Sequence, residues 1–176
     1  MEIYSPDEDS WLLADTVKNF LSKNSPKKIL EIGSGSGFQL QNLKKLGIKK
    51  QNIFSCDTNP NAVKHCRELG FNCIESNLFQ NICGKFHIVL FNPPYLPDDK
   101  REPKNSKLAT TGGKNGSEII NEFLKSAKSH LEKNSKIFLL TSSLTKGIKW
   151  NRFKKRKIAS KKLFFEEIYV WELKIN

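Results

Sequence analysis

The chain is predicted to be an α/β protein with a mostly parallel sheet, because short apolar runs alternate with helix-length segments along most of its length. A glycine-rich turn follows the first apolar run, where nucleotide-binding α/β units place their ligand. The last residues, 161–175, carry aliphatic and aromatic side chains but no helix-length polar face. This tail predicts an antiparallel hairpin that closes one sheet edge and completes a seven-stranded sheet.

Five apolar runs bounded by polar turns predict parallel strands at 28–32, 53–57, 72–75, 87–92 and 136–141. The segments between them predict helices over 38–46, 60–69 and 117–131. A further helix is predicted near the N-terminus, with Ser5 as N-cap, Pro6 in the first helical position and Glu8 completing a capping box. In this topology the third strand lies at a sheet edge, where a partner strand could add.

The length of 176 residues suits one domain, so residues 1–176 are predicted to be a single unit. The formal net charge is +12, which favours a polyanionic partner such as RNA or the ribosome. The four cysteines have no C-x-x-C pairing, so we expect buried, reduced thiols and neither a zinc site nor disulfides. No apolar run is long enough to span a membrane, and we expect a cytoplasmic protein.

The glycine-rich turn, Gly33 to Gly37, is a candidate cofactor site because glycines let a ligand approach the backbone. Phe38 stands where the dinucleotide fingerprint requires its last glycine, so S-adenosylmethionine fits better than a pyrophosphate cofactor. Asp57 ends the second strand, where a carboxylate can accept both ribose hydroxyls. Asn77 follows the third strand and can accept the adenine amino group. The alternative interpretations are a capping Asp and an ordinary turn Asn.

The segment Asn92-Pro93-Pro94-Tyr95 follows the fourth strand and is the candidate catalytic segment. Its prolines fix φ and remove two backbone donors, which leaves carbonyl oxygens and the Asn92 amide oxygen as acceptors for a substrate NH2 group. Tyr95 can pack against a planar substrate. The arrangement predicts methyl transfer to an amide or exocyclic amine nitrogen by proximity and alignment. Taken alone, the segment could instead be a strand that ends in a Pro-Pro turn.

Four blocks of sequence resemble the HemK-like glutamine methyltransferases of archaea and eukaryotes: Tyr4 to Asp15, Leu30 to Gly37, Asn92 to Tyr95 and Gly112 to Glu118. The resemblance implies a class I S-adenosylmethionine-dependent methyltransferase that modifies the glutamine of the Gly-Gly-Gln motif in class I release factors. It also implies a heterodimer with a small zinc-binding activator protein. Asn77 departs from the family, which has Asp at this place.

The same resemblance implies the roles of individual residues. The cofactor would be contacted by Ser10, Glu31, Gly33, Gly35, Asp57, Asn77, Leu78 and Asn92. Asn92 would also bind the substrate amide, with Pro93 and Tyr95 beside it. The loop 97–115 follows directly and could cover the substrate.

Between Lys146 and Lys162 nine residues are Lys or Arg and none is acidic, while Trp150 and Phe153 interleave with them. This basic run could contact RNA, the ribosome or an acidic release factor, or it could be a solvated face. Two other functions remain open. A nucleic-acid methyltransferase acting on adenine N6 or guanine N2 uses the same Asn-Pro-Pro-Tyr chemistry, and a non-catalytic RNA-binding module would need no intact Asn92.

Overall fold

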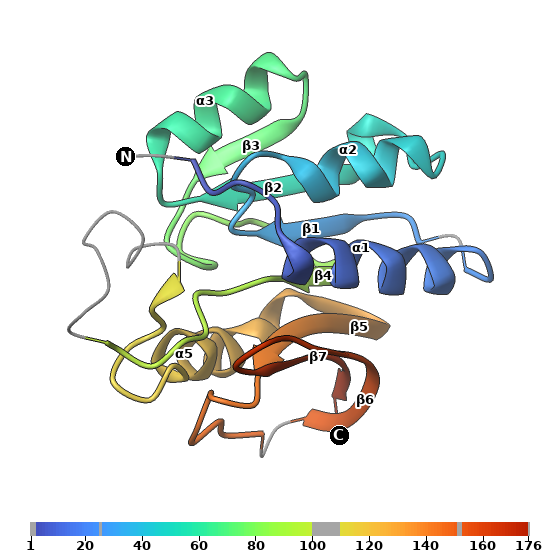
Figure 1. Cartoon of the computed structure of the whole chain (residues 1–176). Helices are drawn as coiled ribbons and strands as arrows, with labels where there is room; N and C mark the ends of the chain where they lie inside the picture. Colours follow the sequence, from blue (N-terminus) through green and yellow to red (C-terminus); the bar gives the residue numbers. More distant parts are fainter. Residues whose placement is uncertain (1–2, 25, 100–109, 151–152, 176) are drawn as a thin grey trace.

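In a computed structural model, which describes residues 3–24, 26–99, 110–150 and 153–175, the chain forms a seven-stranded sheet with the order β3-β2-β1-β4-β5-β7-β6 (Figure 1). The first five strands are parallel, and β7 runs antiparallel to both of its neighbours, so β6 points in the same direction as β1 to β5. The predicted fold class is confirmed. The strands are β1 (Ile29–Ile32), β2 (Ile53–Asp57), β3 (Asn72–Glu75), β4 (Phe86–Phe91), β5 (Leu131–Ser142), β6 (Phe153–Lys162) and β7 (Glu167–Ile175).

Helices connect the parallel strands and cover both faces of the sheet. They are α1 (Glu8–Leu21), α2 (Phe38–Lys45), α3 (Pro60–Glu68) and α5 (Glu118–Ala127), with 3-10 turns η1 (Lys50–Asn52) and η2 (Lys128–His130). Apolar side chains of α1, α2 and α3, such as Leu13 and Leu40, pack on one face. Those of α5, such as Phe123, pack on the other face. Because both faces are covered, the central strands are almost continuously apolar.

The predicted start of the first helix is wrong. Asp7, not Ser5, is the N-cap of α1, and its carboxylate accepts the backbone N–H of Glu8 at 2.8 Å. Residues 3–7 precede the helix in non-helical conformation, so they are free to cross the carboxyl end of the sheet. A capping box therefore does not form, and Glu8 pairs instead with Lys161 of β6.

The C-terminal hairpin begins at Phe153 and not near residue 161, where it was predicted. Most of the basic run forms its first strand, the edge strand β6, and β7 inserts between β5 and β6. Lysines along an edge strand oppose unwanted strand pairing, which gives the run a structural role. Phe153 is buried in the core and is not a surface ring for base stacking.

Two further findings concern the cysteines and the helices. Cys56, Cys66 and Cys73 are buried, but Cys83 is exposed, which corrects the expectation that all four are buried. None of the helices in the described part of the chain is both long and apolar enough to cross a membrane.

The sheet order reverses between β1 and β4, so the segments after these two strands diverge and leave a crevice at their carboxyl ends. Ile32 of β1 pairs with Phe91 of β4. The glycine-rich turn and the Asn-Pro-Pro-Tyr segment begin directly after these paired residues. The register therefore places the two predicted halves of the site next to each other.

Candidate active site

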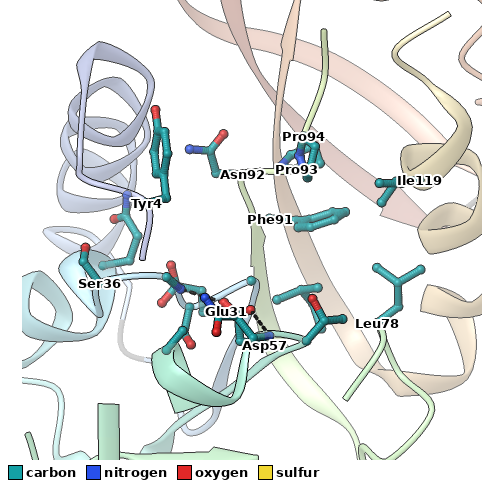
Figure 2. Close-up of a pocket in the computed structure, with 18 of the residues that line it drawn as sticks. Tyr4, Glu31, Ser36, Asp57, Leu78, Phe91, Asn92, Pro93, Pro94 and Ile119 are labelled. Carbon is teal, nitrogen blue, oxygen red and sulfur yellow. Dashed lines mark hydrogen bonds between the residues drawn. The ribbon is translucent and has the colours of Figure 1, made fainter. Parts of the chain in front are cut away.

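A pocket of about 780 Å³ opens at this crevice. It is lined by the ends of β1, β2 and β4, the start of α1 and the turn after β3, with α5 contributing Ile119. In Figure 2, Tyr4 and Asn92 lie on one side of the pocket, and Leu78 and Ile119 lie on the other. The segments that follow β1 to β4 and the one that precedes α1 thus supply most of the lining residues.

The glycine-rich turn forms one wall of the pocket. Gly33 and Gly35 adopt φ values of +73° and +49°, a left-handed conformation that favours glycine. The backbone N–H of Gly35 donates to Asp57 Oδ2 at 2.8 Å, and the N–H of Asn59 donates to Asp57 Oδ1 at 2.8 Å (Figure 2). Asp57 therefore holds the turn in shape. Each of its carboxylate oxygens keeps a second lone pair for a ligand in the pocket.

Glu31, the next-to-last residue of β1, supplies an unsatisfied acceptor to the pocket. Its side chain is buried, and its Oε2 atom has no hydrogen-bond partner among the described residues. Burial raises the pKa of this carboxyl well above its usual range, and the nearby Asp57 carboxylate raises it further. A ligand that brings a positive charge or a donor to this place would satisfy Glu31.

The turn after β3 carries Asn77 and Leu78 at the pocket wall. Leu78 has φ +49°, which is uncommon for a residue other than glycine. Its carbonyl accepts from Ser76 Oγ at 3.0 Å and from Cys56 Sγ at 3.4 Å, so buried side chains hold it in place. Strained backbone kept by such contacts is typical of ligand-binding sites.

Asn92 directly follows β4, and its side chain lies at the pocket. Its Nδ2 donates to Asp9 Oδ2 at 3.0 Å, whereas its Oδ1 is buried and has no partner among the described residues. Because the carboxylate can only accept, it fixes which end of the Asn92 amide faces it. The free end is an acceptor at the pocket, which suits a substrate N–H.

Asp9 is a functional candidate to which the sequence assigned no role of its own. This buried carboxylate also accepts from the Tyr4 hydroxyl at 3.1 Å and the Tyr95 hydroxyl at 3.5 Å. Burial raises the pKa of both phenols, and the charge of Asp9 adds to it, so both remain protonated donors at neutral pH. The signal in the sequence was the position of Asp9 inside the N-terminal block, but nothing there indicated a partner 83 residues away.

Glycines of the block from Gly112 to Glu118 pack directly on the catalytic segment. A Cβ atom at Gly112 would collide with the Pro94 carbonyl oxygen, and one at Gly116 would collide with that of Tyr95. Leu96 and Thr111 form a bridge beside them. The block therefore packs tightly on the Asn-Pro-Pro-Tyr backbone and helps to fix its position. Residues 100–109 of the predicted covering loop, 97–115, lie outside the described residues.

The pocket brings together most of the predicted site residues. Those that line it are Ser10, Glu31, Gly33, Gly35, Asp57, Asn77, Leu78, Asn92 and Pro93. Tyr95 does not line it and contacts Asp9 instead. Within the described ranges, no group of three or more His, Cys, Asp or Glu side chains could hold a metal ion.

The sheet order, the antiparallel edge and the pocket at the switch point define a class I S-adenosylmethionine-dependent methyltransferase. A family model described as the methyltransferase small domain matches residues 4–162. The chain belongs to this family, and the predicted resemblance is confirmed.

Comparison with known proteins identifies similar sequences and folds. A protein of Methanocaldococcus jannaschii provisionally named as a protein N5-glutamine methyltransferase is 39% identical, over 98% of this chain and 93% of that protein. The mouse methyltransferase HEMK2 is 27% identical over 80% of this chain and 72% of its own length. The structure of the E. cuniculi Mtq2-Trm112 complex, described as responsible for methylation of the termination factor eRF1, matches with a TM-score of 0.78 and 23% identity over the full length of both chains.

A Bacteroides fragilis methyltransferase bound to S-adenosyl-L-homocysteine has a TM-score of 0.62 and 18% identity, over 93% of this chain and 77% of that one. At such low identity the two structural matches establish the fold. The sequence relatives indicate which reaction to consider.

Proposed function

We propose that this chain methylates the side-chain nitrogen of the glutamine in the Gly-Gly-Gln motif of a class I release factor. The observation that supports this most directly is the free, buried Oδ1 atom of Asn92, whose other end is fixed by Asp9. The M. jannaschii relative with the N5-glutamine name supports the same substrate class.

The pocket fits S-adenosylmethionine in its chemistry. The ligand carries a sulfonium and an ammonium group, and the unpartnered Glu31 oxygen is an acceptor that such a cation would satisfy. Gly33 and Gly35 leave the turn open to close approach, Asp57 has free lone pairs for hydroxyl groups, and Leu78 offers an apolar wall. When bound, the cofactor supplies a methyl group on a positively charged sulfur.

The role of the catalytic segment is to hold a planar NH2 group. A glutamine amide has two N–H donors, and Asn92 Oδ1 would accept one of them. A backbone carbonyl of the proline segment would accept the other. These bonds orient the nitrogen, and they make it slightly more electron-rich without removing a proton beforehand. Rate enhancement then comes mainly from alignment and from the exclusion of water.

The activator subunit is proposed to bind the edge strand β3. Among the residues that the structure describes, this strand pairs only with β2, so its outer side is open for strand addition. Its outward groups are partly occupied, because Arg67 Nε donates to the Cys73 carbonyl at 2.7 Å and Asn81 Nδ2 to the Glu75 carbonyl at 2.9 Å. An added strand would displace these two side chains, which protect the edge in the free chain.

The experiment that tests the function measures transfer of labelled methyl groups to a recombinant class I release factor, with the activator present. The substrate is compared with its Gly-Gly-Ala variant, and total RNA is offered in parallel because the chain is strongly basic. We expect label on the unmodified factor and none on the variant. Label on RNA alone would replace the proposal with nucleic-acid amine methylation.

The matched enzyme control is Asn92→Ala. It removes the free acceptor at the pocket and should abolish transfer, while the Kd for S-adenosylhomocysteine changes by less than about threefold. Retained transfer would contradict the role of Asn92.

A further inference from the structure

Most of the exposed large apolar side chains lie at the carboxyl end of the sheet, where the pocket opens, and we call this end the rim. In the described part of the chain five large apolar side chains are exposed, and four of them belong to segments at the carboxyl end of the sheet. Trp11 lies in the first turn of α1, Leu144 follows β5, and Phe164 and Phe165 lie in the turn between β6 and β7. Leu46 is the exception, at the far end of α2.

The β6–β7 turn, residues 163–166, carries the most exposed pair. Phe164 and Phe165 are 93% and 85% exposed, and their rings contact each other edge to face with centroids 4.7 Å apart. Exposing the apolar surface of two adjacent phenyl rings to water is unfavourable, and at this place the rings bury little surface against the core. They are typical of a surface that another molecule covers.

Several contacts hold this turn near the active site. Ser143, at the end of β5, donates its backbone N–H to the Glu167 carbonyl at 2.8 Å, and Lys161 pairs with Glu8 at the start of α1. Figure 1 shows the turn, in dark red, on the same side of the sheet as the first turn of α1. Asp9, one residue after Glu8, is hydrogen-bonded to Asn92.

Glu166 of this turn lies near the hydroxyl groups of Tyr4 and Tyr95. Its charge adds to the elevation of both tyrosine pKa values, after the larger effects of burial, of Asp9 and, for Tyr4, of Asp7. Its Oε2 atom is buried and has no hydrogen-bond partner among the described residues. A peptide backbone N–H would satisfy this oxygen, whereas a phosphate group would be repelled by it.

The nearby aromatic rings are poor platforms for nucleobases. Lys155 Nζ lies 4.6 Å from the ring centre of Trp150 and 4.9 Å from that of Trp171. Lys157 Nζ lies 4.4 Å from the ring centre of Tyr169. Because ammonium groups cover these rings, stacking of bases on them would first have to break the cation–π contacts.

We propose that Phe164 and Phe165, with Trp11 and Leu144, form a docking surface for the folded protein that carries the target glutamine. This inference rests on the proposed function. The partner surface would be apolar where it meets the two phenyl rings. It would be acidic beside them, because β6 carries the exposed lysines Lys154, Lys155, Lys157 and Lys162. Glu166 would bind a backbone N–H of the segment that enters the pocket.

The test compares the wild type with the double variant Phe164→Ser/Phe165→Ser, each as the complex with its activator. Leu46→Ser is the matched control, since it removes an exposed apolar side chain away from the rim. We expect the KM for the intact release factor to rise about tenfold or more in the double variant, as is usual for aromatic contact residues. The kcat and the Kd for S-adenosylhomocysteine should remain within about twofold. A second variant, Leu144→Ser, should raise the KM in the same direction.

The outcomes separate the two proposals. An unchanged KM in both rim variants, with wild-type transfer to the factor intact, would overturn the docking surface and leave the proposed function standing. Absence of transfer by the wild type would overturn the proposed function and the docking surface with it. Loss of RNA binding in the double variant, with unchanged affinity for the factor, would assign the rim to a nucleic acid instead.

Discussion

At the scale of single residues, the orientation of the Asn92 amide group decides whether the proposed substrate can be bound. Asn92 could face the pocket with either its oxygen or its nitrogen, and only the oxygen can accept a substrate N–H. Asp9 selects the oxygen by accepting the Nδ2 hydrogen, and the two phenols of Tyr4 and Tyr95 hold Asp9 in turn. Asp9 is therefore a positioning residue for Asn92.

Replacing Asp9 by Asn should lower kcat by about 10- to 100-fold, in the range found for groups that orient a reactive partner. The Asn side chain places an NH2 group where one carboxylate oxygen accepted hydrogens, so Asn92 loses its fixed orientation. The measurement is single-turnover methyl transfer beside the Kd for S-adenosylhomocysteine, which should be nearly unchanged. Asp7→Asn is the control, since Asn is an equally good N-cap. Wild-type transfer in Asp9→Asn would remove Asp9 from the mechanism.

At the scale of elements, the site depends on a loop that packs on the catalytic segment. Gly112 and Gly116 allow the backbone of their block to approach the Pro94 and Tyr95 carbonyls more closely than any side chain would permit. Glu118 closes this block by accepting the N–H groups of Asn115 and Ser117 at 3.1 Å. The two glycine positions are thus part of how the segment is aimed.

Gly112→Ala should reduce transfer by about 100-fold or more, because displacements of about an ångström have effects of this size. The free energy of unfolding should fall by about 1–3 kcal/mol, as is usual for overpacking at a tight contact. Activity and denaturant unfolding measured on the same samples test this. Gly84→Ala is the control for backbone strain, since its φ is +92° and its Cβ would meet no atom within 4 Å. If both variants lose activity equally, the packing explanation is wrong.

The C-terminal hairpin contains a buried acid among three cations. Glu172 is 4% exposed, and its carboxylate contacts Lys136 Nζ at 2.7 Å, Arg156 at 3.3 Å and Lys174 at 3.7 Å. Burial acts to raise the pKa of Glu172, but the hydrogen bond and charge of Lys136 and the charges of Arg156 and Lys174 outweigh it and lower the pKa. The contacts tie β7 to both of its neighbours.

Glu172→Gln should therefore lower the free energy of unfolding by about 2 kcal/mol near neutral pH. A carboxyl whose pKa is lowered by folding stabilises above its ordinary pKa of 4.5, and this stabilisation is lost as the pH falls through the lowered value. The difference in the free energy of unfolding between the variant and the wild type should shrink below pH 4.5. Urea unfolding at several pH values measures it, and a difference that grows on acidification would contradict the sign.

At the scale of the whole molecule, the two sheet edges differ. The β6 edge is long and rich in lysine, which discourages pairing. The β3 edge is short and open to addition, with Arg67 and Asn81 covering two of its carbonyls. This difference is the basis for placing the activator at β3.

Glu75→Pro should weaken binding of the activator by about tenfold or more, because proline removes a backbone donor that strand addition requires. The backbone N–H groups of successive residues in a strand point to opposite sides, toward one neighbouring strand and then the other. Ser76 N bonds to the Asp57 carbonyl on the β2 side, so the N–H of Glu75 points to the open side. Glu75→Ala keeps this N–H and is the control. Titration calorimetry measures the affinity of each variant for the activator. Equal affinities of the two variants would exclude pairing along β3.

Much of the fold followed from local sequence patterns. Apolar periodicity located four of the parallel strands to within one residue, whereas β5 begins five residues before its predicted start. The glycine turn and Asn-Pro-Pro-Tyr located both halves of the pocket. These signals are local, since a buried parallel strand must be apolar and a tight turn needs glycine. The first helix was misplaced by two residues because Ser5 and Asp7 both qualify as N-caps, and only packing of the segment before α1 chooses between them.

The sequence by itself determined the α/β class and the places of the glycine turn and the Asn-Pro-Pro-Tyr segment along the chain, and it predicted the chemistry of that segment. Only the tertiary structure decided that Asp9 orients Asn92, that Gly112 and Gly116 pack on the proline segment, and that the basic run is an edge strand. These contacts join residues far apart in the chain, and their identity depends on the sheet order that brings separate segments to one edge. No local pattern encodes such a meeting, because it exists only after the strands have paired.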